Sequence, residues 1–590
     1  MTISFLLASY QSGTATPRTL IADLLQRLRT DPDQAIFIHL LSEAEIEPYL
    51  AALDGKSPSA LPLFGIPFAI KDNIDLAGIP TTAACPDFAY TPERSATVVE
   101  RLIAAGAIPL GKTNLDQLAT GLVGVRSPYG VPVNPFHPDY IPGGSSSGSA
   151  VAVARGFAAF ALGTDTAGSG RVPASFNNLI GVKPTCGLLS TTGVVPACRT
   201  LDCVSIFANT TEDAALVLDT AAAFDPADSY SRPLPPQPAG SWSAGLKLGV
   251  PRPDQLEFFG NADAEKLFAG AIETARANGA EIVGIDLAPF LETARLLYEG
   301  PWVAERYLTA KPLLDSKPGA LLPVLQQIIG GGAHATAPDT FSAFYQLAAH
   351  KRRAAAVWET VDAILTPTAG TIYTLAELAA GPIKLNSNLG RYTNFMNLLD
   401  LAVLALPAGF LPTGLPWGVT IFAPAFMDWH LLDFSRRWPA CRKKDNTAPP
   451  PHPSPEIHPP VATLEIAVCG AHLQGLPLNP QLTSRGAWLV RATRTAPVYQ
   501  MVKLPGGPPH RPGLIRRNTG GGAIEVEVWA LPLPAVGSFL AGIPAPLGLG
   551  TVWLEDGSRV CGFVCEAIAA GEAEDITALG SWRGWLQKQA

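Results

Sequence analysis

The sequence predicts an α/β protein with a smaller, β-rich domain of the α+β class behind its main domain. Three observations support this fold class. Apolar segments of strand length alternate with segments of helical periodicity through residues 1–440. A proline-rich segment at 441–462 then interrupts the chain. Beyond it, residues 463–590 contain strand-like alternation, so we expect a main domain, a linker and a second domain with these bounds.

The elements of the main domain follow from apolar spacing. Residues 15–30 carry leucines at helical spacing behind Thr16-Pro17, a frequent helix start. The other expected elements are a buried strand at 62–71, a helix at 95–105, a short strand at 107–111 and a helix of small apolar residues at 149–162. Strands that alternate with helices in this way indicate a sheet with helical layers.

The proline-rich segment predicts a stiff, extended linker, because proline can continue neither a helix nor a central strand. A long surface loop is the alternative. In the second domain, residues 524–532 alternate apolar and polar side chains as a strand with one solvent-facing side does, behind a glycine turn at 520–522. The change of pattern indicates a separate core.

Composition excludes several classes of partner. The 590 residues carry a net charge of −8 and no long basic run, so neither nucleic acid nor an anionic membrane is expected to bind. The eight cysteines form no C-x-x-C pair, and the N-terminus lacks the basic start of a signal peptide. Apolar runs are about half a membrane span. We expect reduced thiols and a cytoplasmic location.

Residues 142–185 contain two serine- and glycine-rich loops around a run of small apolar residues. Glycine lets the backbone turn tightly and approach a ligand closely. Several backbone N–H groups directed at one point form an anion-binding nest, of which an oxyanion hole is one example. The composition therefore predicts a serine nucleophile surrounded by backbone donors.

These loops resemble the signature of the amidase signature family, whose fold is a mixed β-sheet flanked by helices. Gly143-Gly144-Ser145-Ser146 matches its first serine loop, and Ser169 follows 24 residues later in GTDTAGSGR. Lys71 ends the upstream apolar segment FGIPFAIK, where the family has its lysine. Ser147, Ala167 and Gly170 depart from the commonest pattern, but none of them removes a functional group.

The resemblance implies a role for each of these residues. Ser169 is the expected nucleophile, and Ser145, held by a cis peptide, passes the proton between Ser169 and Lys71. The backbone N–H groups of Thr166, Ala167, Gly168 and Ser169 are the expected oxyanion hole, with Asp165 and Arg171 as braces of the loop. Burial lowers a lysine pKa, which would make Lys71 a base. The alternative is a structural lysine paired with Asp72 or Asp75.

Two further segments, 114–130 and 298–307, resemble the allophanate hydrolase branch of the family. Allophanate is a urea that carries a carboxylate, and a guanidinium can bind a carboxylate through two parallel hydrogen bonds. Arg306 is the expected carboxylate ligand, with Tyr298 two helical turns earlier on the same face and Gly121 also at the substrate. A salt bridge from Arg306 to Glu305 or Glu299 is the alternative.

The C-terminal segments 467–479 and 499–517 resemble the domain appended to allophanate hydrolases, whose fold is similar to that of γ-glutamyl cyclotransferases. His472 is its candidate functional residue. The resemblance implies either decarboxylation of N-carboxycarbamate, the first product, or a role in assembly. Glu525 and Glu527 lie on the alternating strand and are as readily explained as solvent-facing residues.

The resemblance implies hydrolysis of allophanate to ammonia and carbon dioxide in urea degradation. It implies no cofactor, a homodimer, and functional coupling to a biotin-dependent urea carboxylase. The alternatives within the family are a general amidase and the ammonia-donating component of an amidotransferase. A non-catalytic scaffold is disfavoured, because all three catalytic side chains are present.

Three other motifs are rejected. Residues 106–113 match the phosphate-loop pattern G-x-x-x-x-G-K-[ST], but the spacer is apolar and Pro109 has no N–H to donate. A Ser-His-Asp hydrolase would need G-x-S-x-G at a strand–helix turn, which neither serine loop has, and His137 is the only nearby histidine. The histidine spacings predict no metal site.

Overall fold

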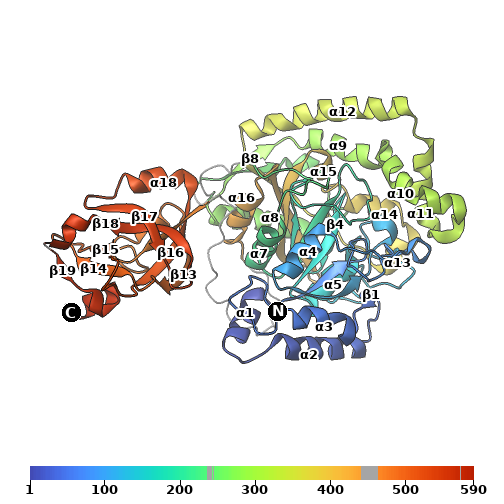
Figure 1. Ribbon diagram of the computed structural model, residues 1–590. Coiled ribbons are helices and arrows are strands. Elements are labelled where there is room, and N and C mark those ends of the chain that lie inside the picture. The colour runs from blue at the N-terminus through green and yellow to red at the C-terminus, as the bar shows by residue number, and fades with distance from the viewer. Residues whose placement is uncertain (236–241, 243–244, 440–462, 572, 590) are drawn as a thin grey trace. The chain divides into compact units, whose positions relative to one another are not determined.

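The computed structural model describes residues 1–235, 242, 245–439, 463–571 and 573–589 (Figure 1). Backbone contacts divide the chain into two compact units, Met1–Ile457 and His458–Ala590. The segment expected to be a linker, 441–462, lies outside the described residues. No described helix is both long and apolar enough to cross a membrane.

The first unit is built on a mixed sheet of eleven strands among the described residues. The strands lie in the order β1-β3-β2-β4-β6-β5-β10-β11-β9-β7-β8. Their bounds are β1 Phe37–Leu40, β2 Pro67–Lys71, β3 Ile108–Thr113, β4 Phe160–Asp165, β5 Ile180–Lys183, β6 Cys203–Ala208, β7 Lys247–Pro251, β8 Glu281–Ile285, β9 Ala363–Pro367, β10 Leu401–Phe410 and β11 Pro416–Pro424. Strand β2 runs parallel to β3 and β4, whereas β4, β6, β5, β10, β11 and β9 pair antiparallel in turn.

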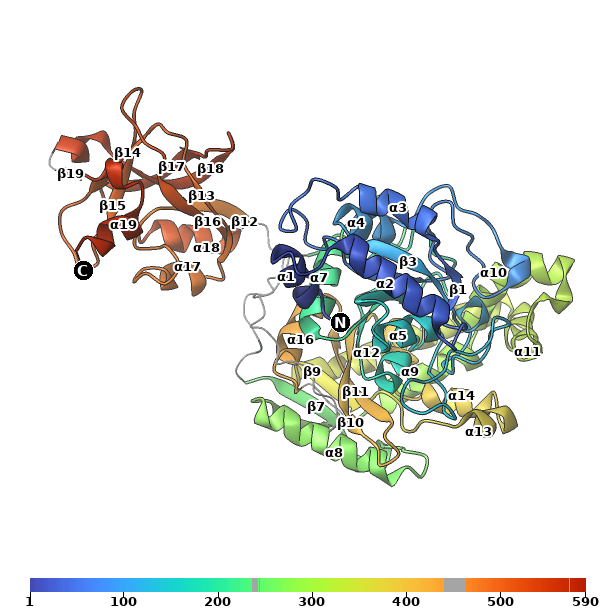
Figure 2. The same cartoon turned by 90° about the horizontal axis from the view of Figure 1, so that it is seen from below.

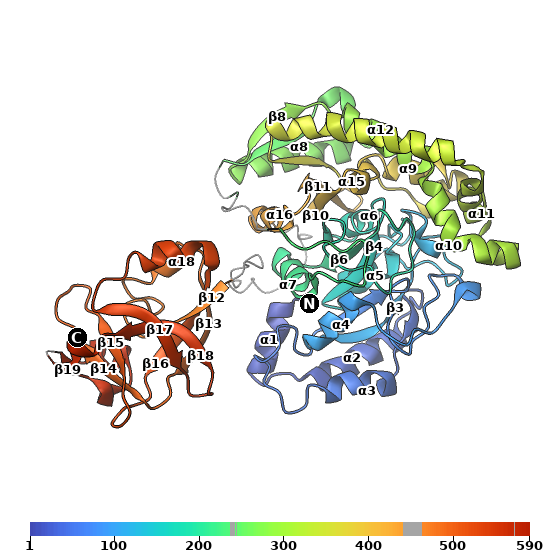
Figure 3. The ribbon, with the colours of Figure 1, turned by 45° about the horizontal axis from the view of Figure 1, so that its top comes forward.

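Helices cover both faces of this sheet. They are α1 Ile3–Gln11, α2 Pro17–Thr30, α3 Glu43–Ala51, α4 Thr97–Ala104, α5 Ser147–Ala154, α6 Val172–Phe176, α7 Thr211–Ala221, α8 Ala262–Ala277, α9 Ala288–Glu299, α10 Trp302–Ser316, α11 Pro323–Gly330, α12 Ala337–Ala355, α13 Leu375–Ala380, α14 Lys384–Leu389, α15 Phe395–Leu398 and α16 Asp428–Ser435. Helices α2 and α3 lie side by side near the N-terminus (Figure 2), and α9 packs along α12 at the opposite end of the unit (Figure 3).

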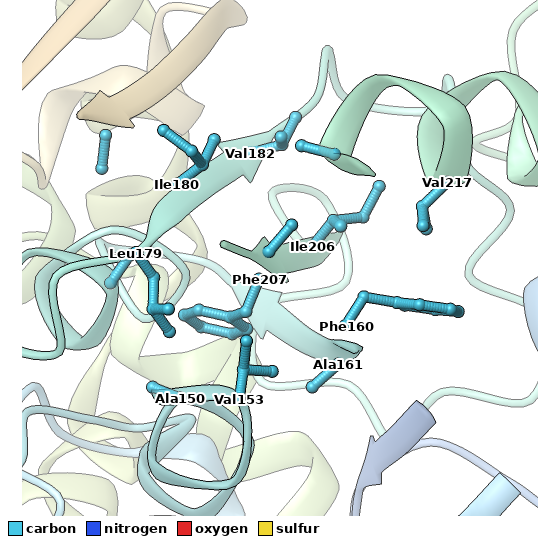
Figure 4. Close-up of a cluster of buried hydrophobic side chains, with 14 of the residues drawn as sticks. Ala150, Val153, Phe160, Ala161, Leu179, Ile180, Val182, Ile206, Phe207 and Val217 are labelled. Atoms are coloured by element: carbon cyan, nitrogen blue, oxygen red, sulfur yellow. The ribbon is translucent and has the colours of Figure 1, made fainter. Parts of the chain in front are cut away.

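Strands β4 and β6 lie at the centre of the core, with α5 on one side and α7 on the other. Phe207 lies beside Ala150 and Val153 of α5, whereas Ile206 lies on the other side of β6, toward α7 (Figure 4). These side chains are at most 1% exposed. Strands that are apolar on both faces need a helical layer on each side, and the small residues of α5 let that helix approach the sheet closely.

The expected helix at 149–162 is wrong in its second half. Helix α5 ends at Ala154, and β4 begins at Phe160. Gly156 adopts a left-handed φ of +68°, which ends the helix, and the buried run that follows becomes a central strand. A fully apolar run has no periodicity that separates a buried helix from a buried strand.

The second unit has its own core, formed on two sheets. A five-stranded sheet has the order β13-β16-β12-β18-β17, and a three-stranded sheet has the order β15-β14-β19 among the described residues. The elements are β12 Thr463–Val468, α17 Pro480–Thr483, β13 Trp488–Arg494, β14 Tyr499–Lys503, β15 Pro512–Arg516, β16 Glu525–Pro532, α18 Leu533–Leu540, β17 Leu547–Trp553, β18 Arg559–Cys565, β19 Glu574–Asp575 and α19 Trp582–Gln587. The strand expected at 524–532 is β16, but residues 526–531 are all buried, so it has no solvent-facing side.

Candidate active site

Lys71 lies at the end of β2, where its side chain is completely buried. Its Nζ donates to Ser145 Oγ and to Thr164 Oγ1, each at 2.8 Å. Burial lowers the pKa of Lys71 to about 7, and nearby carboxylates, foremost Asp116, oppose this only in part. The side chain therefore exchanges its proton near neutral pH. The alternative pairing with Asp72 does not occur, because Asp72 pairs with Lys112 at 2.9 Å.

Ser145 precedes α5 and follows a cis peptide bond at Gly144–Ser145, as the resemblance implied. The loop leaves no room for a side chain at Gly144. A Cβ there would lie 2.3 Å from Asp116 Oδ2 and 2.4 Å from the Gly124 backbone nitrogen. Asp116 also accepts hydrogen bonds from the backbone of Gly124 and Arg126, so it ties the first serine loop to the segment that contains Gly121.

Ser169 lies in the loop between β4 and α6 and is 4% exposed. Its Oγ donates to the Gly121 carbonyl at 3.4 Å, and no hydrogen bond joins it to Ser145 within the described residues. The structure therefore joins Lys71 to Ser145, whereas the hydroxyl of Ser169 is turned toward Gly121.

The backbone donors of the second loop differ from expectation at one position. The N–H of Gly168 donates to Asp165 Oδ1 at 2.9 Å, so this predicted oxyanion donor is already engaged. The N–H groups of Ala167 and Ser169 have no protein acceptor in the described chain and are available to a ligand. The hydroxyl of Thr166 donates to Asp202 at 2.5 Å.

Asp165 and Arg171 brace this loop, as expected. Arg171 makes a two-pronged pair with Asp165, at 2.8 Å from Nε and 2.7 Å from Nη2, and both side chains are inaccessible to solvent. Burial opposes ionisation of Asp165, but Arg171 outweighs it and holds the pKa of Asp165 below its usual value. The charged carboxylate then fixes the N–H groups of Gly168 and Gly170.

The sequence reasoning missed two side chains that act on this loop. Asp202 accepts hydrogen bonds from Thr166 and from the backbone of Cys198, and burial raises its pKa to about 6. Asn397, in α15, donates to the Asp165 carbonyl at 2.8 Å. Both residues come from segments distant in sequence, and no motif marked them.

Arg306 is linked to Ser169 through the segment 119–121, which both side chains contact. Its Nη1 donates to the Ala119 carbonyl at 3.2 Å and to Thr120 Oγ1 at 3.0 Å, directly before Gly121. Arg306 is 3% exposed, and no carboxylate of the described chain lies within ion-pair distance of it. The alternative ion pairs are absent. Glu305 binds Thr200 instead. Glu299 pairs with Arg295.

Tyr298 meets Arg306, but not from the same helix. Helix α9 ends at Glu299 and α10 begins at Trp302, so the expected two-turn spacing on one helix face is wrong. A Gly300-Pro301 break separates the helices and turns the chain. The Tyr298 hydroxyl nevertheless lies 3.5 Å from Arg306 Nη2, with the guanidinium carbon 5.6 Å from the ring centroid.

Gly121 lies between these two groups with φ of +154°. A Cβ at this position would lie 2.6 Å from Asp116 Oδ2 and 3.2 Å from Arg126 Cδ. Only glycine fits, and its backbone faces the Ser169 hydroxyl. Gly121 thus contacts Ser169, while Arg306 contacts Tyr298 and the segment directly before Gly121.

Comparison with known proteins identifies the family. Residues 20–432 match the Amidase family. The chain belongs to this family. Residues 464–587 match the Allophanate hydrolase C-terminal domain. Together the two matches support an amidohydrolase enzyme with an amidase domain and an appended β-rich domain, and the expected fold class is confirmed.

Two similar proteins match both domains. A urea amidolyase from Saccharomyces cerevisiae is 42% identical over 596 residues, which cover 98% of this chain and 32% of the relative. A crystal structure of Kluyveromyces lactis allophanate hydrolase is 39% identical with a TM-score of 0.75, and the match covers 100% of this chain and 99% of that one. The chain thus spans about a third of the length of the urea amidolyase that it matches.

A third relative matches the amidase domain without the appended one. It is a component of the glutamyl-tRNA(Gln) amidotransferase of Pseudomonas fluorescens, 35% identical over 463 residues, which cover 72% of this chain and 93% of the relative. The amidase domain is therefore shared with enzymes of different named activities.

The appended domain places His472 in a small cavity lined by Gln481, Arg511 and Phe563. His472 Nε2 lies 3.0 Å from Gln481 Oε1, and the ring stacks on Phe563 at 5.1 Å between centroids. Burial lowers the pKa of His472, so the neutral imidazole is favoured at neutral pH. Glu527 is buried rather than solvent-facing and pairs with Arg583 at 3.1 Å, as a structural brace.

The rejected motifs lie in structural positions. Residues 108–113 of the phosphate-loop pattern form the buried strand β3. His137 packs against Tyr140 and lies 4.0 Å from Asp139. No group of three metal-ligating side chains gathers anywhere in the described residues.

Replacing Arg171 with leucine should destabilise the amidase domain by about 3–5 kcal/mol, because it leaves the Asp165 carboxylate buried without its partner. Urea unfolding would measure the change. Arg29 forms an exposed ion pair with Glu43 and is the matched control, for which Arg29→Leu should cost at most about 1 kcal/mol. Equal costs for the two variants would contradict the buried brace.

Proposed function

We propose that this chain hydrolyses allophanate, urea-1-carboxylate, to ammonia and carbon dioxide in urea degradation. The observation that carries this proposal is Arg306, a buried guanidinium without a carboxylate partner in the described chain, one short segment from Ser169. A buried cation of this kind favours an anionic substrate, and its planar fork suits a carboxylate. The similarity of both domains to allophanate hydrolase supports the same substrate.

In the proposed mechanism Lys71 is the general base. Its pKa near 7 leaves a large neutral fraction at physiological pH, and Ser145 Oγ lies 2.8 Å from its amine. In this mechanism the Ser169 hydroxyl turns away from the Gly121 carbonyl and donates to Ser145. A proton then passes from Ser169 through Ser145 to Lys71, and the Ser169 oxygen attacks the terminal ureido carbonyl.

The carbonyl oxygen becomes negatively charged as the bond to Ser169 forms. The free N–H groups of Ala167 and Ser169 are the proposed donors to it, each of a kind that contributes about 2.7–4 kcal/mol to the transition state. Lys71 returns its proton through Ser145 to the leaving nitrogen, and ammonia departs. Water then hydrolyses the acyl-enzyme and releases N-carboxycarbamate.

The appended domain is proposed to act on this first product. Loss of carbon dioxide from N-carboxycarbamate gives carbamate, which decomposes to ammonia and a second carbon dioxide. The cavity around His472 supports this role, because Arg511 supplies a cation there for a carboxylate. A role in assembly alone is the alternative.

Carboxylation of urea is one reaction that gives allophanate, and we also propose functional coupling to a biotin-dependent urea carboxylase. The urea amidolyase relatives support this, since their length is about three times the part that matches here. A cytoplasmic location and a homodimer stay predictions.

Ser169→Ala should reduce ammonia release from allophanate by about 10⁴-fold or more without unfolding the protein, and Lys71→Ala should do nearly the same. Ser145→Ala should leave a small residual activity. Ser147→Ala is the matched control, because the Ser147 hydroxyl has no hydrogen-bond partner in the described protein and its loss should be almost neutral. Wild-type turnover by Ser169→Ala would refute this catalytic set.

The rate should fall with pH below about 7, since the base must be neutral and protonation of Lys71 removes it. kcat/KM for malonamate, a carboxylate-bearing amide, should drop about tenfold per pH unit below that pKa and level off above it. Asp202 also titrates, with a pKa of about 6. If the fall in kcat/KM below pH 7 disappears in Asp202→Asn, that titration belongs to Asp202 and not to Lys71.

Arg306→Lys should raise KM for allophanate by about 10- to 100-fold, as expected for a charged hydrogen bond that contributes about 1.5–3 kcal/mol. Biuret, which lacks the carboxylate, should be affected much less. Ammonia release from allophanate, malonamate, biuret and glutamine, compared side by side, separates the functions. Preference for glutamine would favour an amidotransferase component, and equal losses for allophanate and biuret would make Arg306 structural.

A fragment that ends near residue 445 should still release ammonia, because every residue of the proposed amide-cleaving set precedes it. If the appended domain decarboxylates the first product, the fragment should accumulate N-carboxycarbamate, and His472→Ala in the full chain should do so too. Mass analysis of early product and sizing of both proteins distinguish decarboxylation from assembly. A folded but inactive fragment would contradict the independence of the amidase domain.

A further inference from the structure

Two cysteines and a lysine meet at the ends of two paired strands behind the second serine loop. Lys183 ends β5, Cys203 begins β6, and Cys186 lies in the turn that follows β5. The two sulfur atoms are 3.5 Å apart. Lys183 Nζ lies 3.5 Å from Cys203 Sγ and 3.9 Å from Cys186 Sγ. None of these side chains has a role in the proposed amide cleavage.

The lysine is charged and has no ion-pair partner within 4.0 Å in the described chain. It is fully buried, and burial alone would lower its pKa, yet the neighbouring sulfurs and Asp165 outweigh burial and raise the pKa of Lys183. The hydrogen bond from the Cys203 thiol and the charge of Lys183 lower the pKa of Cys186, against burial. Both influences favour ionisation of the Cys186 thiol, and the Cys203 thiol lies beside it as a hydrogen-bond donor.

The two sulfurs also differ in access. Cys186 is partly exposed, whereas Cys203 is 2% exposed. Two neighbouring thiols, one of them in a partly exposed residue beside a cationic side chain, are the arrangement found in oxidation-sensitive cysteines. We propose that Cys186 and Cys203 form a thiol-oxidation site that a peroxide converts to a disulfide.

The chemistry balances with the peroxide as oxidant. The Cys186 thiolate attacks one peroxide oxygen, the O–O bond breaks, and Cys186 becomes a sulfenic acid while hydroxide leaves. The Cys203 sulfur then attacks the Cys186 sulfur, the S–O bond breaks, and water departs as the disulfide forms. In total two thiols lose two electrons and two protons, and one peroxide gives two waters. The sulfurs must close from 3.5 Å to about 2.05 Å.

This closure would act on the oxyanion loop. Cys203 is the register partner of Asp165 across β4 and β6. Asn397 Nδ2 lies 3.8 Å from Cys203 Sγ and 2.8 Å from the Asp165 carbonyl. A shift of Cys203 toward Cys186 therefore pulls on the strand end and the amide that position Asp165. Oxidation lowers amide hydrolysis by displacing the loop that Asp165 holds, and reduction restores it.

The test uses the full chain, treated with hydrogen peroxide and then with dithiothreitol. Tandem mass spectrometry should locate a Cys186–Cys203 bond with the loss of two hydrogen atoms. Fragmentation is needed, because Cys198 follows Cys186 without an intervening trypsin site. Ammonia release should fall by up to about 10²-fold, the size that a 1 Å misplacement can produce, and should recover on reduction.

Cys186→Ser and Cys203→Ser should each keep the basal activity and resist the loss of activity on peroxide treatment. Two separate variants are used so that misfolding of one does not remove the test. Cys561→Ser, a partly exposed cysteine of the other unit, is the control and should stay sensitive to peroxide.

A loss of activity on peroxide treatment that persists in Cys186→Ser, or a disulfide that leaves the rate unchanged, would overturn the proposal. A gain of one oxygen with the loss of two hydrogens, which marks a Lys183–sulfur bridge, would overturn it too. The mass measurement does not depend on the proposed substrate, whereas the activity measurement does.

Discussion

Complete burial of the Lys71 side chain is the physical constraint on which the rest of the amidase domain depends. An ammonium group without water is unfavourable unless another charge compensates it. Here the amine donates to the hydroxyls of Ser145 and Thr164, and its pKa falls to about 7. The first serine loop and strand β4 must hold those hydroxyls in place, and the loop is crowded around Gly144.

Three fully buried lysines illustrate how the partner decides the state of the amine. Lys112 has a carboxylate partner in Asp72, Lys183 has the Pro184 carbonyl and two sulfurs, and Lys71 has hydroxyls. Burial acts on all three in the same direction, toward the neutral form. The charge beside the amine opposes it to different extents: the pKa of Lys183 rises, whereas burial prevails for Lys112 and for Lys71, whose pKa falls to about 7. Lys71 is thus suited to accept a proton, and Lys183 to stabilise a thiolate.

The sequence predicted the parts of the site that lie in short motifs. Ser145 belongs to a glycine-rich loop and Lys71 ends an apolar segment, and the structure joins these two side chains, whereas Ser169 contacts the Gly121 carbonyl. Prediction failed where the pattern was ambiguous. The apolar run 149–162 divides into α5 and β4 at Gly156. Tyr298 and Arg306 belong to two helices, because Gly300-Pro301 ends the first one, a local breaker signal that the two-turn spacing overlooked.

The sequence by itself determined the family, the α/β class and the amine and hydroxyl groups of the site, because these depend on residue type and local spacing. Only the tertiary structure decided which backbone donors are free and which charges are paired. Asp165 engages the Gly168 amide, Arg306 lacks a carboxylate partner in the described chain, and Asn397 reaches the loop from a distant segment. The last two facts depend on contacts between residues far apart in the chain, which no local pattern encodes, and the first depends on the conformation of the loop that Arg171 braces.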